Sequence, residues 1–270
     1  MRIIKYENSK GNSFYLDTND VWIESCDFHK KSWKANSTAK KIGSKFDYYS
    51  LEERSYEVIC MIKEKDKFTI LDKIDEVAEY DIMKDTLGTL SIDDWSIQCG
   101  IIETETYKEN LTTKLSMKIY CPVPLWSRET TRQFKIISGS TGEGGLNYPF
   151  NYDFNYTSSY IKASITNPLS YEADFRMIFY GPCEDPTVNI GENKYKVGCE
   201  LEEGEYIVID TKNSTIKKYD IVGAETNVFS LREPRDFFNK IESGENIITW
   251  DNSFGFDITI IEQKGEPKWS

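Results

Sequence analysis

Few residues in this sequence have the types and spacing that acid–base, nucleophilic or metal chemistry requires. Histidine performs most acid–base catalysis near neutral pH, and the chain has one, His29, in a lysine-flanked turn that favours a surface position. The six cysteines are scattered without a C-x-x-C pair, so the paired ligands of a structural zinc site are missing. No G-x-S-x-G nucleophile elbow occurs. The sequence therefore predicts no enzyme, no catalytic residue, no metal site and no cofactor.

Carboxylates are the one plentiful reactive group, with 45 Asp and Glu residues. Two of them placed across a sugar suffice for glycoside hydrolysis. A glycosidase therefore stays an alternative, although the number of carboxylates is not specific evidence for it. Calcium would need the ordered oxygen ligands of an EF-hand loop, and that spacing is absent. Asp72, Asp75 and Glu76 fall on a predicted helix, where a solvated helix face explains them.

An alternating aromatic run follows a glycine-rich segment near the middle of the chain. Side chains two residues apart lie on the same side of a strand. One interpretation is a strand that faces the core or covers a sheet, and the other is an aromatic platform for a protein partner or a sugar. Both interpretations concern the same residues, which are Tyr148, Phe150, Tyr152, Phe154 and Tyr156.

The composition favours a mostly β protein that is not attracted to nucleic acid or anionic membranes. Aromatic residues make up 14% of the chain, and such side chains fit pleated, half-buried surfaces. The net charge of −12 opposes contact with phosphate backbones and anionic lipids. No apolar run has the length of a signal-peptide core or of a membrane span, so we expect no membrane insertion and folding in a reducing cytoplasm. There Cys60 and Cys121, inside apolar strand patterns, are expected to be small buried hydrophobes.

The order of elements predicts two domains. Short strands fill residues 1–138, interrupted by one helix at about residues 67–86, where Phe68, Leu71, Ile74, Ala78 and Ile82 recur at intervals of three and four. Four glycines between Ser138 and Gly145 indicate a linker, assigned to residues 139–146. Residues 147–270 are strand-rich, with a hairpin turning at Lys212–Asn213, as in a sandwich or jelly roll.

Several ordered segments resemble the distal tail proteins of siphovirus-type phages, which prophages and phage-like bacteriocins also encode. In the first half these are NSFYLDTNDVWIESCDF and LGTLSIDDWSIQCGIIETETYKENLTTKLSMKIYCPVPLWSRE. In the second half they are ITNPLSYEADFRMIFYGPCEDPTVNIGENKYKV, LEEGEYIVIDTKNSTIKKYD and SFGFDITIIEQKGEPKW. The resemblance extends over nearly the whole chain in order. Its motifs belong to the scaffold and include no catalytic signature.

The resemblance implies a fold and a role. The fold would be an N-terminal, β-sandwich-like, ring-forming domain with one helix, followed by a C-terminal galectin-like β-sandwich of the jelly-roll type. The role would be a structural hub, a homohexameric ring at the distal end of the tail tube, assembled in the host cytoplasm and carried at the virion tail tip. Expected partners are further copies of the chain, the tail tube protein, a tail-tip protein, and receptor-binding or baseplate proteins. The alternative is a carbohydrate-binding module for bacterial surface sugars.

Overall fold

The computed structural model describes residues 2–63, 65, 67–109, 112–136 and 161–268. They form a mostly β protein with one α-helix and antiparallel sheets, which confirms the predicted fold class. The chain separates into two compact units, unit 1 (Met1–Arg128 with Gln263–Ser270) and unit 2 (Glu129–Glu262). The division falls within strands β10 (Trp126–Phe134) and β22 (Phe256–Lys264). The linker predicted at 139–146 lies outside the described residues, so the domain boundaries at 138 and 147 stay predictions.

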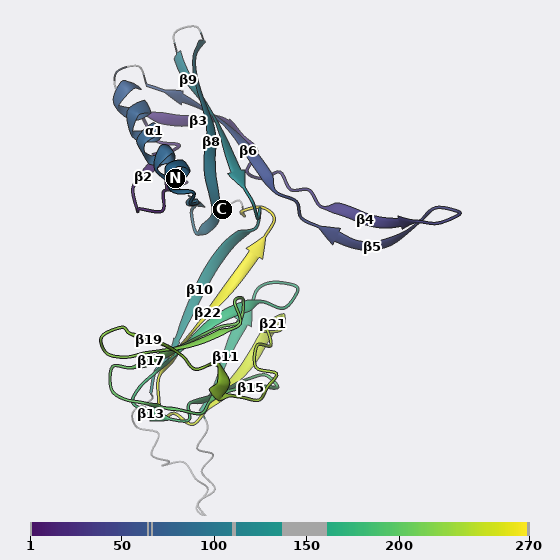
Figure 1. Cartoon of the computed structure of the whole chain (residues 1–270), viewed down its shortest axis with the longest axis vertical. Coiled ribbons are helices and arrows are strands. Elements are labelled where there is room, and N and C mark those ends of the chain that lie inside the picture. The colour runs from purple at the N-terminus through teal and green to yellow at the C-terminus, as the bar shows by residue number, and fades with distance from the viewer. Residues whose placement is uncertain (1, 64, 66, 110–111, 137–160, 269–270) are drawn as a thin grey trace, which may run out of the picture. The chain divides into compact units, whose positions relative to one another are not determined.

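Unit 1 is built on strand β8, which takes part in two antiparallel sheets (Figure 1). Residues 95–99 of β8 pair with β7, in the order β2-β1-β7-β8. Residues 100–109 pair with β9, and the order continues through β6 to β3. The elements are β1 (Ile4–Glu7), β2 (Ser13–Leu16), β3 (Val21–Cys26), β4 (Lys34–Ala39), β5 (Ser44–Ser50), β6 (Arg54–Ile62), α1 (Lys67–Lys84), β7 (Gly88–Ile92), β8 (Trp95–Glu109) and β9 (Thr112–Cys121).

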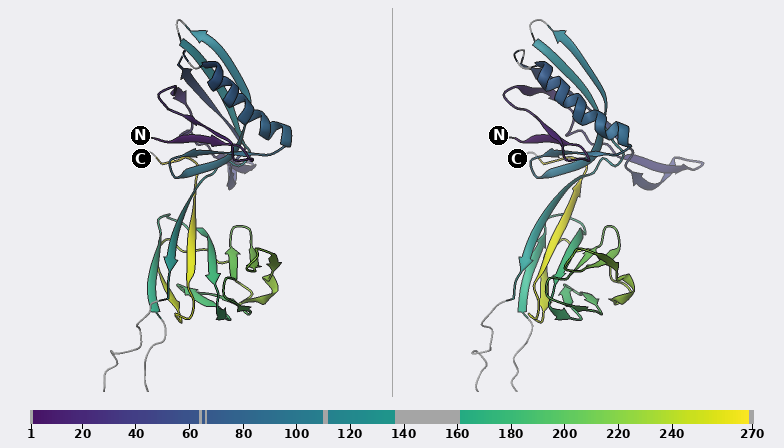
Figure 2. Two further views of the ribbon diagram at one scale, coloured as in Figure 1. Left: turned by 90° about the vertical axis from the view of Figure 1, so that its left-hand side faces the viewer. Right: turned by 60° about the vertical axis from the view of Figure 1, so that its left-hand side comes forward.

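The predicted helix is present as α1 and packs on β8 and β2 (Figure 2). Ile74 and Ala78 are buried, as their spacing predicts, and join a core formed by both sheets. Phe68 and Ile82 share that spacing but are 72% and 51% exposed. The apolar spacing therefore predicted the helix correctly but not the width of the face that it buries.

A buried carboxylate ties the end of α1 to the turn between β1 and β2. Asp81 is 2% exposed. It accepts hydrogen bonds from the Tyr6 hydroxyl at 2.8 Å, from the Ser9 amide at 2.8 Å and hydroxyl at 2.7 Å, and from the Thr86 hydroxyl at 3.2 Å. Burial and the bond to Asp81 raise the pKa of Tyr6, so this phenol stays a donor. The space beside this cluster is too small for a side chain at position 88, because an added Cβ would clash with Tyr6 and Asp81, and the residue there is glycine.

The cysteines of the core are expected to be unreactive in the native protein. Cys60, Cys99 and Cys121 are buried and free, as the apolar strand patterns predicted for Cys60 and Cys121, whereas Cys26 is exposed. Burial raises the pKa of Cys60 to about 12, and the thiolate is the nucleophile. Brief treatment of native protein with iodoacetamide should alkylate Cys26 and leave the three buried thiols unmodified in peptide mass spectra. Urea-unfolded protein is the control, with all six labelled; equal labelling of Cys60 and Cys26 in native protein would contradict this burial.

Unit 2 is a sandwich of two antiparallel sheets. One has the order β19-β18-β17-β12-β22-β10, and the other has the order β11-β21-β14-β15-β20. Strands β17 and β18 form the hairpin predicted around Lys212–Asn213. The elements are β11 (Ile161–Asn167), β12 (Asp174–Tyr180), β13 (Cys183–Glu184), β14 (Thr187–Ile190), β15 (Asn193–Val197), β16 (Glu200–Leu201), β17 (Tyr206–Asp210), β18 (Thr215–Tyr219), β19 (Glu225–Asn227), η1 (Phe229–Leu231), β20 (Arg232–Glu233) and β21 (Gly244–Trp250).

Aromatic side chains fill the space between the two sheets of unit 2. The rings of Phe175 and Tyr195 meet edge to face at 5.3 Å, and those of Trp250 and Phe256 at 5.2 Å. Each pair joins a strand of one sheet to a strand of the other, so the core lies between them. The sandwich class is therefore confirmed, while the galectin-like, jelly-roll assignment stays a prediction.

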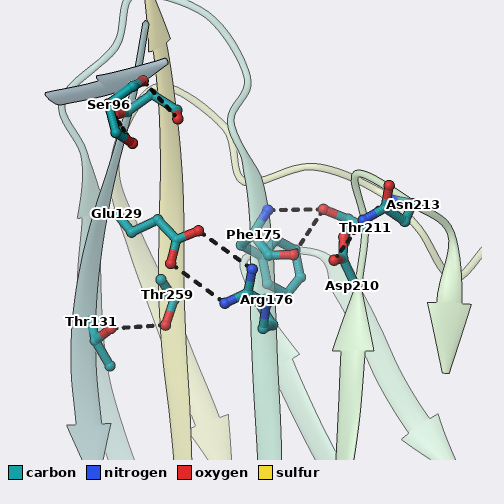
Figure 3. A network of polar contacts seen from close by, with 10 residues as sticks. Ser96, Glu129, Thr131, Phe175, Arg176, Asp210, Thr211, Asn213 and Thr259 are labelled. Atoms are coloured by element: carbon teal, nitrogen blue, oxygen red, sulfur yellow. Dashed lines mark hydrogen bonds and ion pairs between the residues drawn. The ribbon is translucent and has the colours of Figure 1, made fainter. Parts of the chain in front are cut away.

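Polar contacts fix the edges of strands within unit 2 (Figure 3). Arg176 on β12 donates to both carboxylate oxygens of Glu129 at 3.4 and 3.3 Å. The buried Thr211 hydroxyl accepts the amide of Phe175 at 2.8 Å and lies 3.0 Å from its carbonyl, which extends the pairing of β12 with β17 by one residue. These contacts hold the sheet in register.

Candidate interaction surfaces

The predicted aromatic platform is not placed by the structure. Tyr148, Phe150, Tyr152, Phe154 and Tyr156 all lie outside the described residues. Both interpretations of this run, a sheet-covering strand and a platform for a partner or a sugar, therefore stay predictions.

His29, the single histidine of the chain, contacts an arginine. His29 is half-buried, its Nε2 accepts a hydrogen bond from Arg2 at 3.0 Å, and burial followed by the charge of Arg2 lowers its pKa. Among residues 2–63, 65, 67–109, 112–136 and 161–268, no three His, Cys, Asp or Glu side chains are placed to hold a metal ion. None of the helices described here is long and apolar enough to cross a membrane.

A two-stranded arm, β4–β5, is the most exposed structured element of unit 1 (Figure 1). Its two strands pair with each other and form a separate sheet. Three aromatic side chains lie on β5 in contact with solvent, namely Phe46 (51% exposed), Tyr48 (62%) and Tyr49 (65%). At the tip, Ile42 is 90% exposed. Large apolar side chains gathered on one projecting element are typical of a surface that binds another protein.

The same arm is basic in an acidic protein. Residues 34–50 contain four lysines and one aspartate, a net charge of +3, whereas the whole chain has −12, which leaves −15 on the other residues. Lys40, Lys41 and Lys45 surround the tip, and no ion pair is recorded for them within the described residues. The charge of the arm favours contact with acidic protein surfaces.

Polar contacts hold the arm in a defined shape although it buries little. The Asn36 amide donates to the Ser50 hydroxyl at 2.8 Å, and the Thr38 hydroxyl donates to Asp47 at 2.7 Å. At the base, Arg54 donates to the carbonyl of Lys30 and, at 3.1 Å, to the hydroxyl of Ser32. An isolated hairpin of this size is marginally stable in water, so these cross-strand contacts pre-organise the arm.

Two shallow polar concavities accompany these surfaces. One lies at the base of the arm and is lined by Trp33, Glu53 and Arg54 among others. The other lies over β14 and β15 in unit 2, where Lys196 is held between Asp185 at 3.0 Å and Glu233 at 3.4 Å. Polar and charged residues form most of both linings, so neither concavity has the apolar lining of a small-molecule site.

Sequence analysis did not single out the arm, although two of its features are visible in the sequence. The segment KANSTA lacks the alternation of large apolar and polar residues that is usual for a strand covering a core. The following KKIGSK concentrates lysines around a glycine turn in an acidic chain. Together they predict a hairpin with two solvent-exposed faces, but only the structure shows that the aromatic residues beside it are exposed as well.

Comparison with known proteins finds likeness at the level of structure. No family model matches the sequence, and no curated protein matches it. Among solved structures, the Dit protein (gp 19.1) of phage SPP1, described as a paradigm of the hub adsorption apparatus in phages that infect Gram-positive bacteria, superposes with a TM-score of 0.64 at 10% identity. The match covers 98% of this chain and 99% of that one.

Chains of a phage baseplate superpose over a similar length. In the activated phage P2 baseplate with Ca the TM-score is 0.56 at 13% identity, covering 99% of this chain and 100% of that chain. In the activated baseplate with Sr the TM-score is 0.55 at 13% identity, with the same coverage. At such identities the likeness is one of fold. Over nearly its whole length, the chain therefore shares its fold with a phage hub protein and with phage baseplate chains, as the sequence resemblance predicted.

Proposed function

We propose that this chain is a structural hub of a phage tail, a homohexameric ring at the distal end of the tail tube that joins the tube to the tail-tip or baseplate proteins. The observation that carries the proposal is the superposition on the SPP1 Dit protein, which covers 98% of this chain and 99% of the other. The likeness extends over almost all of both chains, so the proposal concerns the whole chain and not one domain.

The exposed arm supplies what a ring needs. A closed ring of identical subunits requires two different, complementary surfaces on each copy, repeated head to tail. The basic, aromatic β4–β5 arm is one such surface, because it projects from unit 1 and makes its strand pairing only within itself. The tail tube protein, a tail-tip protein and receptor-binding or baseplate proteins are the proposed further partners. The proposed location is the virion tail tip, after assembly in the host cytoplasm.

The role proposed here is structural and involves no reaction. The superposed structures are a hub protein and baseplate chains, which favour an assembly component over a free carbohydrate-binding module. The carbohydrate alternative rests on the sandwich-like second half and on the aromatic run at residues 148–156, and that run lies outside the described part of the chain and adds no support.

Light scattering and negative-stain microscopy of the purified full-length chain test the proposal. Six copies of the 31.3 kDa chain give about 188 kDa, and the expected particle is a ring with a central opening. Association of identical subunits follows mass action, so the measurement covers a range of concentrations.

The same measurement is repeated after mixing the chain with purified tail tubes of the phage that carries it. Tubes without the chain are the control for ring-shaped ends. Failure to form a ring alone, together with failure to cap the tubes, would contradict the hub role.

A further inference from the structure

The loop between β3 and β4, residues 27–33, is contacted by two segments of unit 1 that lie at opposite ends of the sequence. The N-terminal segment reaches it through Arg2, whose guanidinium donates to His29 Nε2 at 3.0 Å. The C-terminal segment reaches it through Glu266, which pairs with Lys31 at 2.6 Å. All of these residues belong to unit 1. A cation from one segment and a carboxylate from the other therefore meet at the loop that leads into the β4–β5 arm.

The contact with Arg2 requires an uncharged imidazole. A guanidinium has donors and no acceptor, so the ring nitrogen of His29 that faces it must use its lone pair. Arg2 is itself held in place, because its Nε lies 4.0 Å from Asp93 in the turn between β7 and β8, and the amide of Ile3 donates to the same carboxylate at 2.9 Å. In the protonated ring both nitrogens are donors. Protonation therefore removes the acceptor and leaves two cations facing each other.

The C-terminal segment supplies groups that favour the protonated ring. Burial, and then the charge of Arg2, lower the pKa of His29, whereas the charge of Glu266 and the backbone carbonyl of Pro267 act in the opposite direction. The two charges that act on the ring thus have opposite signs and come from opposite ends of the chain. Each is bound to its own partner, as given above, so both stay near the ring when its charge changes.

We propose that His29 is a pH-dependent switch that exchanges Arg2 for Glu266 as the partner of this loop. The neutral ring accepts from Arg2, and the protonated ring releases Arg2 and pairs with Glu266. Histidine is the side chain that ordinarily changes charge between about pH 5 and 8, and this chain has one. Because the pKa of His29 in the folded chain lies below its ordinary value of 6.5, the unfolded chain binds the proton first, and stability falls as the pH drops below that value.

The titration midpoint of His29 tests the two partners separately. Hydrogen–deuterium exchange at the imidazole C2 position, measured by mass spectrometry, reports on this ring in the full chain whatever its oligomeric state, since there is no second histidine. Arg2→Met should shift the midpoint upward, because it removes the opposing cation, and Glu266→Gln should shift it downward. Lys5→Met is the matched control: it removes a cation of the same N-terminal segment whose partner is Glu7, and should leave the midpoint unchanged.

Double-mutant cycles test whether the partner changes with pH. The first cycle combines Arg2→Met with His29→Ala, and the second combines Glu266→Gln with His29→Ala. At about pH 7.5 the first pair should be coupled by about 2–4 °C in the thermal unfolding midpoint, as a hydrogen bond of ordinary strength gives in a chain of this size, and at about pH 5 this coupling should vanish. The second coupling should follow the opposite course, because Glu266 attracts the ring only when the ring is charged.

His29→Gln separates the switch from packing, since its amide oxygen accepts from Arg2 at every pH and its side chain stays uncharged. Its unfolding midpoint should depend less on pH below 6.5 than that of the wild type. A titration midpoint that neither partner variant shifts, or couplings that are equal at the two pH values, would overturn the inference, because a histidine with only a structural role gives that result. Circular dichroism at about pH 7.5 verifies the fold of each variant. If Arg2→Met does not fold, the Glu266→Gln titration and cycle decide alone.

Discussion

Replacing Phe46, Tyr48 and Tyr49 together by serine is expected to abolish self-association while leaving the monomer folded. The three side chains are 51%, 62% and 65% exposed, so their loss removes little buried area within the chain. Aromatic side chains at the centre of an interface commonly contribute about 2 kcal/mol or more each when they are truncated. The mass measured by light scattering should fall from about 188 kDa to 31.3 kDa, with an unchanged circular dichroism spectrum below the unfolding transition.

A matched control removes similarly exposed apolar side chains elsewhere. Ile221 and Val222, in the turn between β18 and β19, are 78% and 84% exposed. Their replacement by serine should leave both the mass and the unfolding midpoint unchanged. If the arm variant assembled as the wild type does, the exposed aromatic residues would have no part in assembly.

Gly88→Ala is expected to be among the most destabilising single substitutions in unit 1. A Cβ atom at Gly88 would lie 2.5 Å from the Tyr6 hydroxyl, 2.6 Å from Asp81 Oδ2 and 2.7 Å from the carbonyl oxygen of Glu7. The backbone oxygen is part of the β1–β7 pairing, so the clash cannot be relieved by rotating one flexible side chain. Overpacking costs about 1–3 kcal/mol, and disturbing the hydrogen bonds to buried Asp81 adds to it.

Hydrogen exchange localises the effect. Amide protection in β1, β7 and α1 should fall, while protection in β12 and β17 of unit 2 provides an internal reference. Gly100→Ala, on the adjacent strand β8, is the matched control, because its added Cβ would meet only Leu87 at 3.7 Å. Equal loss of protection in both variants would argue against steric crowding as the cause.

Local sequence patterns were reliable where burial follows a simple period. The spacing of Ile74 and Ala78 predicted α1, and the apolar runs around Cys60 and Cys121 predicted buried strands. In these elements each apolar side chain finds its place through the geometry of its own helix or strand. The ordered segments that resemble distal tail proteins then predicted a fold that the superposition on the SPP1 Dit protein confirms at 10% identity.

The candidate interaction surfaces were harder to predict because they break the usual relation between residue type and burial. Phe46, Tyr48 and Tyr49 are residues that a sequence assigns to a core, yet all three are exposed. Phe68 and Ile82 on α1 fit the apolar period of the helix and are exposed too. In both cases burial would require another helix or strand to pack against these side chains. The spacing of residues within one element does not show whether such a neighbour is present.

By itself, the sequence determined the mostly β class, the position of the helix and the net charge of −12, since these follow from residue type and short-range spacing. Only the tertiary structure decided that β8 belongs to two sheets and that β4 and β5 pair with each other as a separate sheet. Strand pairing joins residues far apart in the chain, and the exposed side chains are those that such pairing leaves uncovered. For that reason the exposed aromatic side chains of the β4–β5 arm became visible as one surface only in the folded chain.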